Sequence, residues 1–223
     1  LSTSCTISGE VISAHTASLN GGQLVEDVGN TKMNAYCNDN NEDVQEALSY
    51  VKKNGIEIFP YDFMNKIKIK QEVYYDADYK LFYGIYNGKK LYLSSKFKYK
   101  FHAKRYFNNL FKEQIENSPH KYLTDDFNVD DASIVFDIGT AEGIFALEII
   151  DKVKKVYMFE CDPLWIEALK ITFKDYADKI EIVNKYVSDK TNENEITIDD
   201  FVKEKNLENC DCFIKMDIEG SEI

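Results

Sequence analysis

The sequence feature that most constrains this chain is residues 134–143, IVFDIGTAEG. Four apolar residues and Asp137 lead into a turn that carries Gly139 and Gly143, and the following IFALEII has the composition of a helix. A buried strand, a glycine-bearing turn and a helix in direct succession are typical of a parallel α/β sheet that holds a charged cofactor. We therefore expect a cofactor site at this turn.

Strands and helices alternate from this point onward. Asp162 followed by Pro163 is a standard helix start, because aspartate caps free amides and proline suits the first helical turn. Repeated strand–helix–strand units predict a parallel sheet covered by helices, with right-handed crossovers. The expected fold class is α/β, a doubly wound parallel sheet that follows an N-terminal α+β segment. The expected strands are 133–139, 155–160, 179–184 and 211–220 with its exit turn, and the expected helices are 142–151, 162–177 and 197–206.

Two local patterns precede the alternating part. Residues 43–53 have apolar positions at helical spacing, and Gly55 follows as a stop. Two aromatic-rich strands within 79–93 flank Asn87-Gly88, the residue pair typical of a type I′ hairpin. These patterns predict a helix and a two-stranded hairpin.

Charge is spread unevenly along the chain, whose formal net charge is −12. The basic, aromatic segment 96–116 lies in the positive part and has three interpretations: an amphipathic element with its lysines in water, a wall for an anionic sugar-phosphate or glycan, or a nucleic-acid surface. The acidic total argues against a nucleic-acid-binding protein. The division expected is a segment of unknown role (1–75), a hairpin with a basic aromatic helical segment (76–130) and a cofactor-binding domain (131–223).

Other compositional features narrow the class of protein. No run of 18 or more apolar residues occurs, so no membrane span is expected, and no secretory signal is visible, so we expect a cytoplasmic protein. Five cysteines at irregular spacing do not predict a disulfide framework. Cys210 and Cys212 are separated by one residue and lack a second ligand pair, so no metal site is expected.

The residues of the turn indicate which cofactor it would hold. The spacing is D-x-G-x-x-x-G, without the middle glycine of a dinucleotide fingerprint, and Asp137 and Glu142 would repel a pyrophosphate. They favour a cationic ligand such as S-adenosylmethionine, which carries a sulfonium and an ammonium group. The turn resembles motif I of the class I methyltransferases, with Ala141 at the central glycine. The resemblance implies that Asp137, Gly139, Thr140 and Gly143 bind the cofactor.

A second acid lies one strand later. Glu160 ends the second predicted strand, 23 residues beyond Asp137, where an acid accepts hydrogen bonds from ribose hydroxyls in such folds. Cys161 would border the adenine. Tyr186 has two open interpretations, an adenine-stacking ring or a core aromatic.

Five motifs in order give a more specific resemblance. They are IVFDIGTAEG, MFECDP, YVSDK, TIDDF and FIKMDIEGSEI, and together they resemble the FkbM-type methyltransferase family over residues 130–223, more weakly from about residue 80. The resemblance implies S-adenosylmethionine-dependent O-methylation, often of a sugar or other glycan-linked hydroxyl. The implied partner is a small-molecule or glycan acceptor, and a homo-oligomer is left open.

The fourth strand carries the candidate acceptor site. A hydroxyl needs a base to take its proton, and Asp217 is the first candidate and Glu219 the second. Asp217 could instead only position the cofactor. Alternation places Lys215 on the face of Asp217, as a substrate-binding residue, a group that lowers the pKa of Asp217 or a simple ion-pair partner. His120 is a further substrate-binding candidate, and Glu222 is expected to begin the next helix.

Two alternatives stay open beside this reading. One is an NAD-type oxidoreductase, and the other is a non-catalytic cofactor-binding module on the same fold. Class I methyltransferase sheets usually have seven strands, whereas the predicted strands here end at the fourth. We therefore expect a truncated sheet.

Overall fold

The computed structural model describes residues 40, 42–55, 59, 61–116, 118, 120–125, 128–129 and 133–218. The described residues belong to two compact units, one up to Ile67 and one from Lys68 to Ile218. The candidate base Glu219 lies outside the described residues, and so does Glu222, which was expected to begin a helix. No helix in the described ranges is both long and apolar enough to cross a bilayer.

The first unit contains two helices, α2 (Glu42–Asn54) and α3 (Asp62–Lys66). The helix predicted at 43–53 is confirmed, and Gly55 ends it as expected, with φ +87° and its N–H bonded to the carbonyl of Val51 at 2.9 Å. The side chain of Asn65 donates to the hydroxyl of Tyr50 at 2.5 Å, which ties the two helices together.

The second unit begins with a small antiparallel sheet of three strands, β1 (Val73–Asp76), β2 (Leu81–Tyr86) and β3 (Lys89–Tyr92), in that order. Asn87 and Gly88 both have positive φ, 46° and 79°, which confirms the type I′ turn. The strand β1 was not predicted. Its four residues pair with β2 across a turn in which Lys80 also has positive φ.

Helix α4 (Lys100–Glu113) covers one face of this small sheet. Its buried residues Ala103, Phe107 and Leu110 lie at helical spacing, and they confirm the amphipathic interpretation of 96–116. Gly84 makes the close packing possible, because a Cβ there would lie 2.1 Å from the ring of Phe107. Among its lysines, Lys104 forms an ion pair with Glu72.

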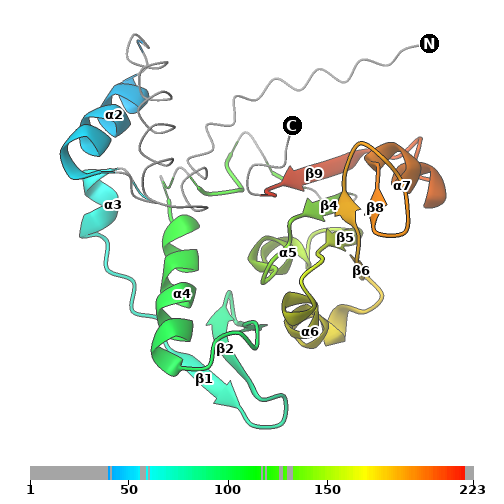
Figure 1. Ribbon diagram of the computed structural model, residues 1–223, viewed down its shortest axis with the longest axis horizontal. Helices are drawn as coiled ribbons and strands as arrows, with labels where there is room; N and C mark the ends of the chain where they lie inside the picture. The colour runs from blue at the N-terminus through cyan, green and yellow to red at the C-terminus, as the bar shows by residue number, and fades with distance from the viewer. Residues whose placement is uncertain are drawn as a thin grey trace. The chain divides into compact units, whose positions relative to one another are not determined.

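A four-stranded parallel sheet forms the centre of the second unit (Figure 1). All four predicted strands are present, and they adopt the order β6-β5-β4-β9. The first strand is therefore central, the next two add on one side of it, and the fourth adds on the other. Ligands of open α/β sheets bind at the carboxyl ends of the strands where the order reverses, which here is between β4 and β9. The bounds are β4 Ile134–Ile138, β5 Lys155–Phe159, β6 Ile180–Val183 and β9 Cys212–Met216.

Helices cover both faces of this sheet. On one face α5 (Ile144–Ile149) and α6 (Pro163–Thr172) join the core that contains Val135 and Met158. On the other face α7 (Ile198–Glu204) places Phe201 against Phe136. A two-stranded parallel pair, β7 (Tyr186–Val187) and β8 (Glu195–Ile196), precedes α7.

The helix starts follow the sequence signals closely. The Asp162 carboxylate accepts a hydrogen bond from the Leu164 amide at 2.8 Å, which confirms the predicted N-cap of α6. Thr197 caps α7 in the same way, through the amide of Asp200. The predicted helix 162–177 ends earlier, at Thr172, and a 3₁₀ turn over Lys174–Tyr176 takes up the remainder.

Candidate functional site

The turn after β4 uses its own amides to fold. The amides of Gly139 and Thr140 both donate to the carbonyl of Phe159, at 3.1 and 3.2 Å, and the Thr140 hydroxyl donates to the carbonyl of Asp137 at 2.8 Å. The amide of Ala141 donates to the Glu160 carboxylate at 2.8 Å. These donors are therefore committed within the protein rather than presented to a ligand.

Three residues of the turn have left-handed backbone. Gly139 has φ +74°, and a Cβ there would lie 1.9 Å from the carbonyl oxygen of Asp217, so no other residue fits without displacing β9. Gly143 has φ +83°, and its Cβ would meet Leu169 at 2.8 Å. Ala141, at the position of the family's central glycine, has φ +49°. This geometry explains why the motif prefers glycine at all three positions.

Asp137 is completely buried at the end of β4. The ammonium of Lys215 lies 3.1 Å from its Oδ1 and donates to the carbonyl of Gly139 at 2.8 Å. The ion pair lacks hydrogen-bond geometry, and neither oxygen of Asp137 accepts a hydrogen bond from any described residue. Burial raises the pKa of Asp137, and the charge of Lys215 opposes that rise.

Lys215 therefore differs from its prediction in one respect. It is an ion-pair partner, but its partner is Asp137 on the neighbouring strand, not Asp217. Its side chain is 7% exposed, and its ammonium also lies over the ring of Tyr122, 5.0 Å from the ring centre. Alternation along β9 could not show this, because the choice of partner depends on the parallel register between β4 and β9.

Asp217 lies just past the end of β9, beside the glycine turn. Its amide donates to the carbonyl of Ile138 at 3.0 Å, and its Oδ2 accepts a hydrogen bond from the hydroxyl of Tyr122 at 2.9 Å. The carboxylate is half-buried. The predicted first candidate for the base is thus at the strand ends, where the order of the sheet reverses.

Two further carboxylates, those of Glu142 and Glu113, belong to the site. Glu142, 4% exposed, accepts a hydrogen bond from the Tyr106 hydroxyl at 2.5 Å, and burial raises its pKa. Glu113 has a pKa raised to about 8, first by burial and then by the charges of Glu142 and Asp217. Tyr106 and Glu113 both belong to α4.

Sequence analysis missed Tyr106, Glu113 and Tyr122. Their spacing offered one signal: Tyr106 and Glu113 are seven residues apart, so a helix places them on one face. Tyr122 follows the candidate His120 by two residues. No sequence pattern connects this segment with the end of β9, which lies 95 residues later.

Glu160 lies directly after β5, at the expected position, and backbone amides hold its carboxylate. Its Oε1 accepts from the amides of Cys161 and Asp162, at 2.7 and 2.8 Å, in addition to the bond from Ala141. Burial raises the pKa of the neighbouring Cys161 thiol to about 11. Tyr186 is 63% exposed, so the core-aromatic interpretation is wrong.

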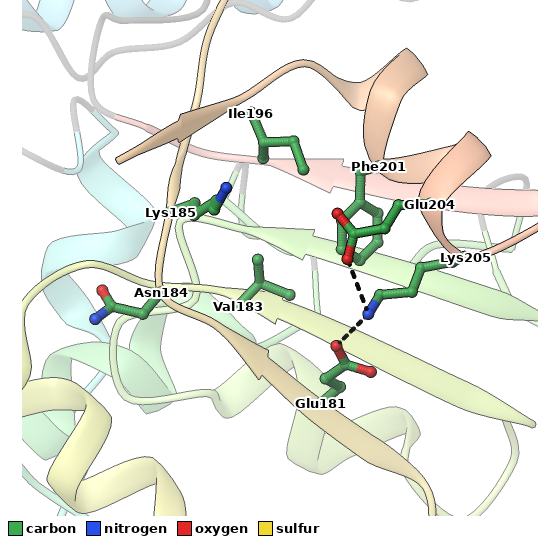
Figure 2. Close-up of a pocket in the computed structure, with 8 residues that line it drawn as sticks. All are labelled: Glu181, Val183, Asn184, Lys185, Ile196, Phe201, Glu204 and Lys205. Atoms are coloured by element: carbon green, nitrogen blue, oxygen red, sulfur yellow. Dashed lines mark ion pairs between the residues drawn. The ribbon is translucent and has the colours of Figure 1, made fainter. Parts of the chain in front are cut away.

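Two other features of the sheet's surroundings concern metal and ligand binding. No group of three or more metal-ligating side chains occurs among the residues described by the structure. A hollow of about 170 Å³ lies beside β6 and α7 (Figure 2). Lys205 spans it, with ion pairs to Glu181 at 2.7 Å and Glu204 at 3.4 Å. None of the predicted site residues lines this hollow, which lies on the α7 side of the sheet.

Comparisons with known proteins gave one structural similarity. No family model and no curated protein matches the sequence. The structure is similar to the crystal structure of methyltransferase FkbM from Methylobacillus flagellatus KT, with 23% sequence identity and a TM-score of 0.39. The match covers 49% of this chain and 31% of that chain.

Proposed function

We propose that the chain is an FkbM-type, S-adenosylmethionine-dependent O-methyltransferase of doubly wound class I architecture, which methylates a hydroxyl of a sugar or another glycan-linked acceptor. The observation that carries the proposal is the excess of carboxyls where the strand order reverses: Asp137, Glu142 and Asp217 lie about this turn, and Lys215 pairs with Asp137. Asp137 and Glu142 are both buried. Because acids outnumber the lysine, such a site suits a ligand with positive charge.

The same turn fits S-adenosylmethionine better than a dinucleotide. A dinucleotide fingerprint offers its amides to a pyrophosphate, but the amides of Gly139, Thr140 and Ala141 already donate inside the protein. The acids of the turn would also repel that pyrophosphate. These two facts weigh against the NAD-type alternative, for which we also find no partner for a reacting carbonyl.

The residues that would hold the cofactor come from the carboxyl ends of β4 and β5, with the turns that follow them, and from the start of β7. Glu160 is fixed by three backbone amides, and its carboxylate oxygens retain lone pairs for ribose hydroxyls. Tyr186 is exposed and therefore free to stack on an adenine ring. The full proposed set is Asp137, Gly139, Thr140, Gly143, Glu160, Cys161 and Tyr186.

Bound S-adenosylmethionine would supply an activated methyl group, which leaves its sulfur as the acceptor oxygen forms the new O–C bond. Asp217 takes the proton that leaves the acceptor hydroxyl. Glu219 stays a second candidate for this role, and Lys215 and His120 stay candidates for acceptor binding. The remaining contribution of the site is to hold the two reactants in line.

Two substitutions test the proposal. Glu160→Ala should weaken binding of S-adenosylmethionine about tenfold or more, because a ribose anchor is lost. Asp217→Asn should lower methyl transfer to a sugar panel at least about a hundredfold while binding persists. Binding is measured by calorimetry and transfer with methyl-labelled cofactor. Normal turnover in Asp217→Asn would remove Asp217 as the base, and binding without any turnover in the wild type would favour the non-catalytic module.

A further inference from the structure

Tyr122 lies in the segment between α4 and the parallel sheet, outside every motif of the cofactor site. Its hydroxyl donates to Oδ2 of Asp217 at 2.9 Å, and its ring receives the ammonium of Lys215 at 5.0 Å from the ring centre. We propose that Tyr122 is a positioning residue that orients Asp217 toward the acceptor hydroxyl. The inference rests on the proposed function, in which Asp217 is the base.

The hydrogen bond leaves one oxygen of Asp217 for the acceptor. Oδ2 is occupied by Tyr122, whereas no side chain in the described ranges donates to Oδ1. A carboxylate held at one oxygen presents the other in a fixed direction, which is what proton transfer over hydrogen-bond distance requires. Tyr122 thereby fixes which lone pairs of Asp217 face the acceptor.

Lys215, the cation of this site, is bound by groups other than Asp217. The ammonium of Lys215 is held by Asp137, by the carbonyl of Gly139 and by the face of the Tyr122 ring. Lys215 therefore neutralises Asp137 rather than Asp217. The negative charge of Asp217 is instead stabilised by a neutral donor, so it stays available to accept a proton.

Other contacts hold Tyr122 in place. Its ring meets Phe145 of α5 edge-on, with ring centres 5.6 Å apart. Its amide donates to the side-chain oxygen of Gln114 at 3.3 Å, directly after α4. Because its ring packs on α5 and its backbone amide bonds to the residue after α4, Tyr122 loses little conformational freedom when it orients Asp217.

Several charged groups surround Tyr122 and Asp217. Glu113 of α4, Glu142 of the turn and Asp137 of β4 are carboxyls that interact with Asp217 or with Tyr122, and Lys215 is the cation of the group. Burial and the neighbouring Asp217 raise the pKa of Tyr122 far above its usual value, so its hydroxyl keeps its proton at every working pH. Tyr122 is therefore a neutral hydrogen-bond donor to Asp217 among several carboxyls.

The test compares two tyrosines that each donate to a carboxylate. Tyr122→Phe removes the bond to Asp217, and the control Tyr86→Phe removes a bond of 3.0 Å to Glu148, between β2 and α5. Carbon-13 NMR at one fixed pH follows the Asp217 carboxyl, assigned with Asp217→Asn. We expect Tyr122→Phe to shift this carboxyl resonance, because the hydrogen bond to Oδ2 is lost, and Tyr86→Phe to leave it unchanged.

A second readout separates positioning from simple packing. With an acceptor from the sugar panel, Tyr122→Phe should lower kcat about tenfold, with KM for S-adenosylmethionine unchanged. An unmoved Asp217 carboxyl resonance and an unchanged kcat, in a chain that binds S-adenosylmethionine, would overturn the positioning role. Failure of the wild type to bind S-adenosylmethionine would instead overturn the proposed function and with it the role of the base.

Discussion

At the scale of single residues, the tightest point of the site is Gly139, over which the carbonyl of Asp217 passes. A Cβ at this position would lie 1.9 Å from that oxygen, and both residues lie directly after paired strands of the sheet, β4 and β9. Gly88 offers a matched comparison, because its φ is also positive, +79°, but a Cβ there meets nothing within 4 Å. Comparing the two separates close approach from backbone strain.

Gly139→Ala should lower the free energy of unfolding by roughly 3 kcal/mol or more, since strain and overlap act together. Gly88→Ala should lower it by about 1 kcal/mol, from the left-handed backbone alone. Urea denaturation of both variants measures the difference. Equal losses would mean that β9 does not approach the turn as described.

Ala141 occupies left-handed backbone, with φ +49°, where the related motif has glycine. This conformation costs an alanine about 1 kcal/mol relative to glycine, so Ala141→Gly should raise the free energy of unfolding by about that amount. The control Ala168→Gly, in the interior of α6, should lower it by at least about 1 kcal/mol. Chemical denaturation measures the free energy of unfolding of both variants. A lower value for Ala141→Gly than for the wild type would contradict the left-handed backbone at Ala141.

Glu113 makes stability depend on pH. Its pKa is about 8 in the folded chain against an ordinary value of 4.5. Between these values the folded state retains a proton that the unfolded state has lost, so its contribution to stability falls as pH rises, by at most about 1.4 kcal/mol per unit. Glu113→Gln should flatten this decline between pH 5 and 8, whereas Glu116→Gln, at an exposed position, should not. Denaturation midpoints measured across that pH range test this prediction. If stability fell with pH equally in Glu113→Gln and in the wild type, the role of Glu113 would be refuted.

At the scale of elements, α4 connects the small sheet with the candidate site. Phe107→Ala should cost about 3–5 kcal/mol, because this fully buried ring fills the space over Gly84. Phe101→Ala on the same helix should change stability by less than about 0.5 kcal/mol, since Phe101 is 69% exposed. Thermal or urea unfolding compares the two, and similar losses would contradict the amphipathic packing of α4.

Most elements were predictable because their signals are local. The hairpin follows from Asn87-Gly88, the start of α6 from Asp162-Pro163, and the parallel strands from their apolar runs. The short strand β1 was missed because pairing with β2, rather than its own sequence, makes it a strand. The end of α6 was misplaced because the 3₁₀ turn continues the same apolar spacing.

At the scale of the whole second unit, the strand order was only partly open to sequence reasoning. Alternation predicted a parallel sheet, and the motif predicted a ligand turn after β4. The partners across the site came from long-range contacts: Lys215 with Asp137, Tyr122 with Asp217, and Tyr106 with Glu142. Such contacts depend on register and on how α4 packs, and neither leaves a pattern in one sequence.

The negative charge of the candidate site favours a ligand that carries positive charge. Four acids, Asp137, Glu142, Glu113 and Asp217, influence one another in the neighbourhood of Lys215. The most direct test of the account is calorimetric titration of the chain with S-adenosylmethionine, S-adenosylhomocysteine and NAD in parallel. The account predicts micromolar binding of the first two and none of NAD. Binding of NAD without S-adenosylmethionine would contradict it.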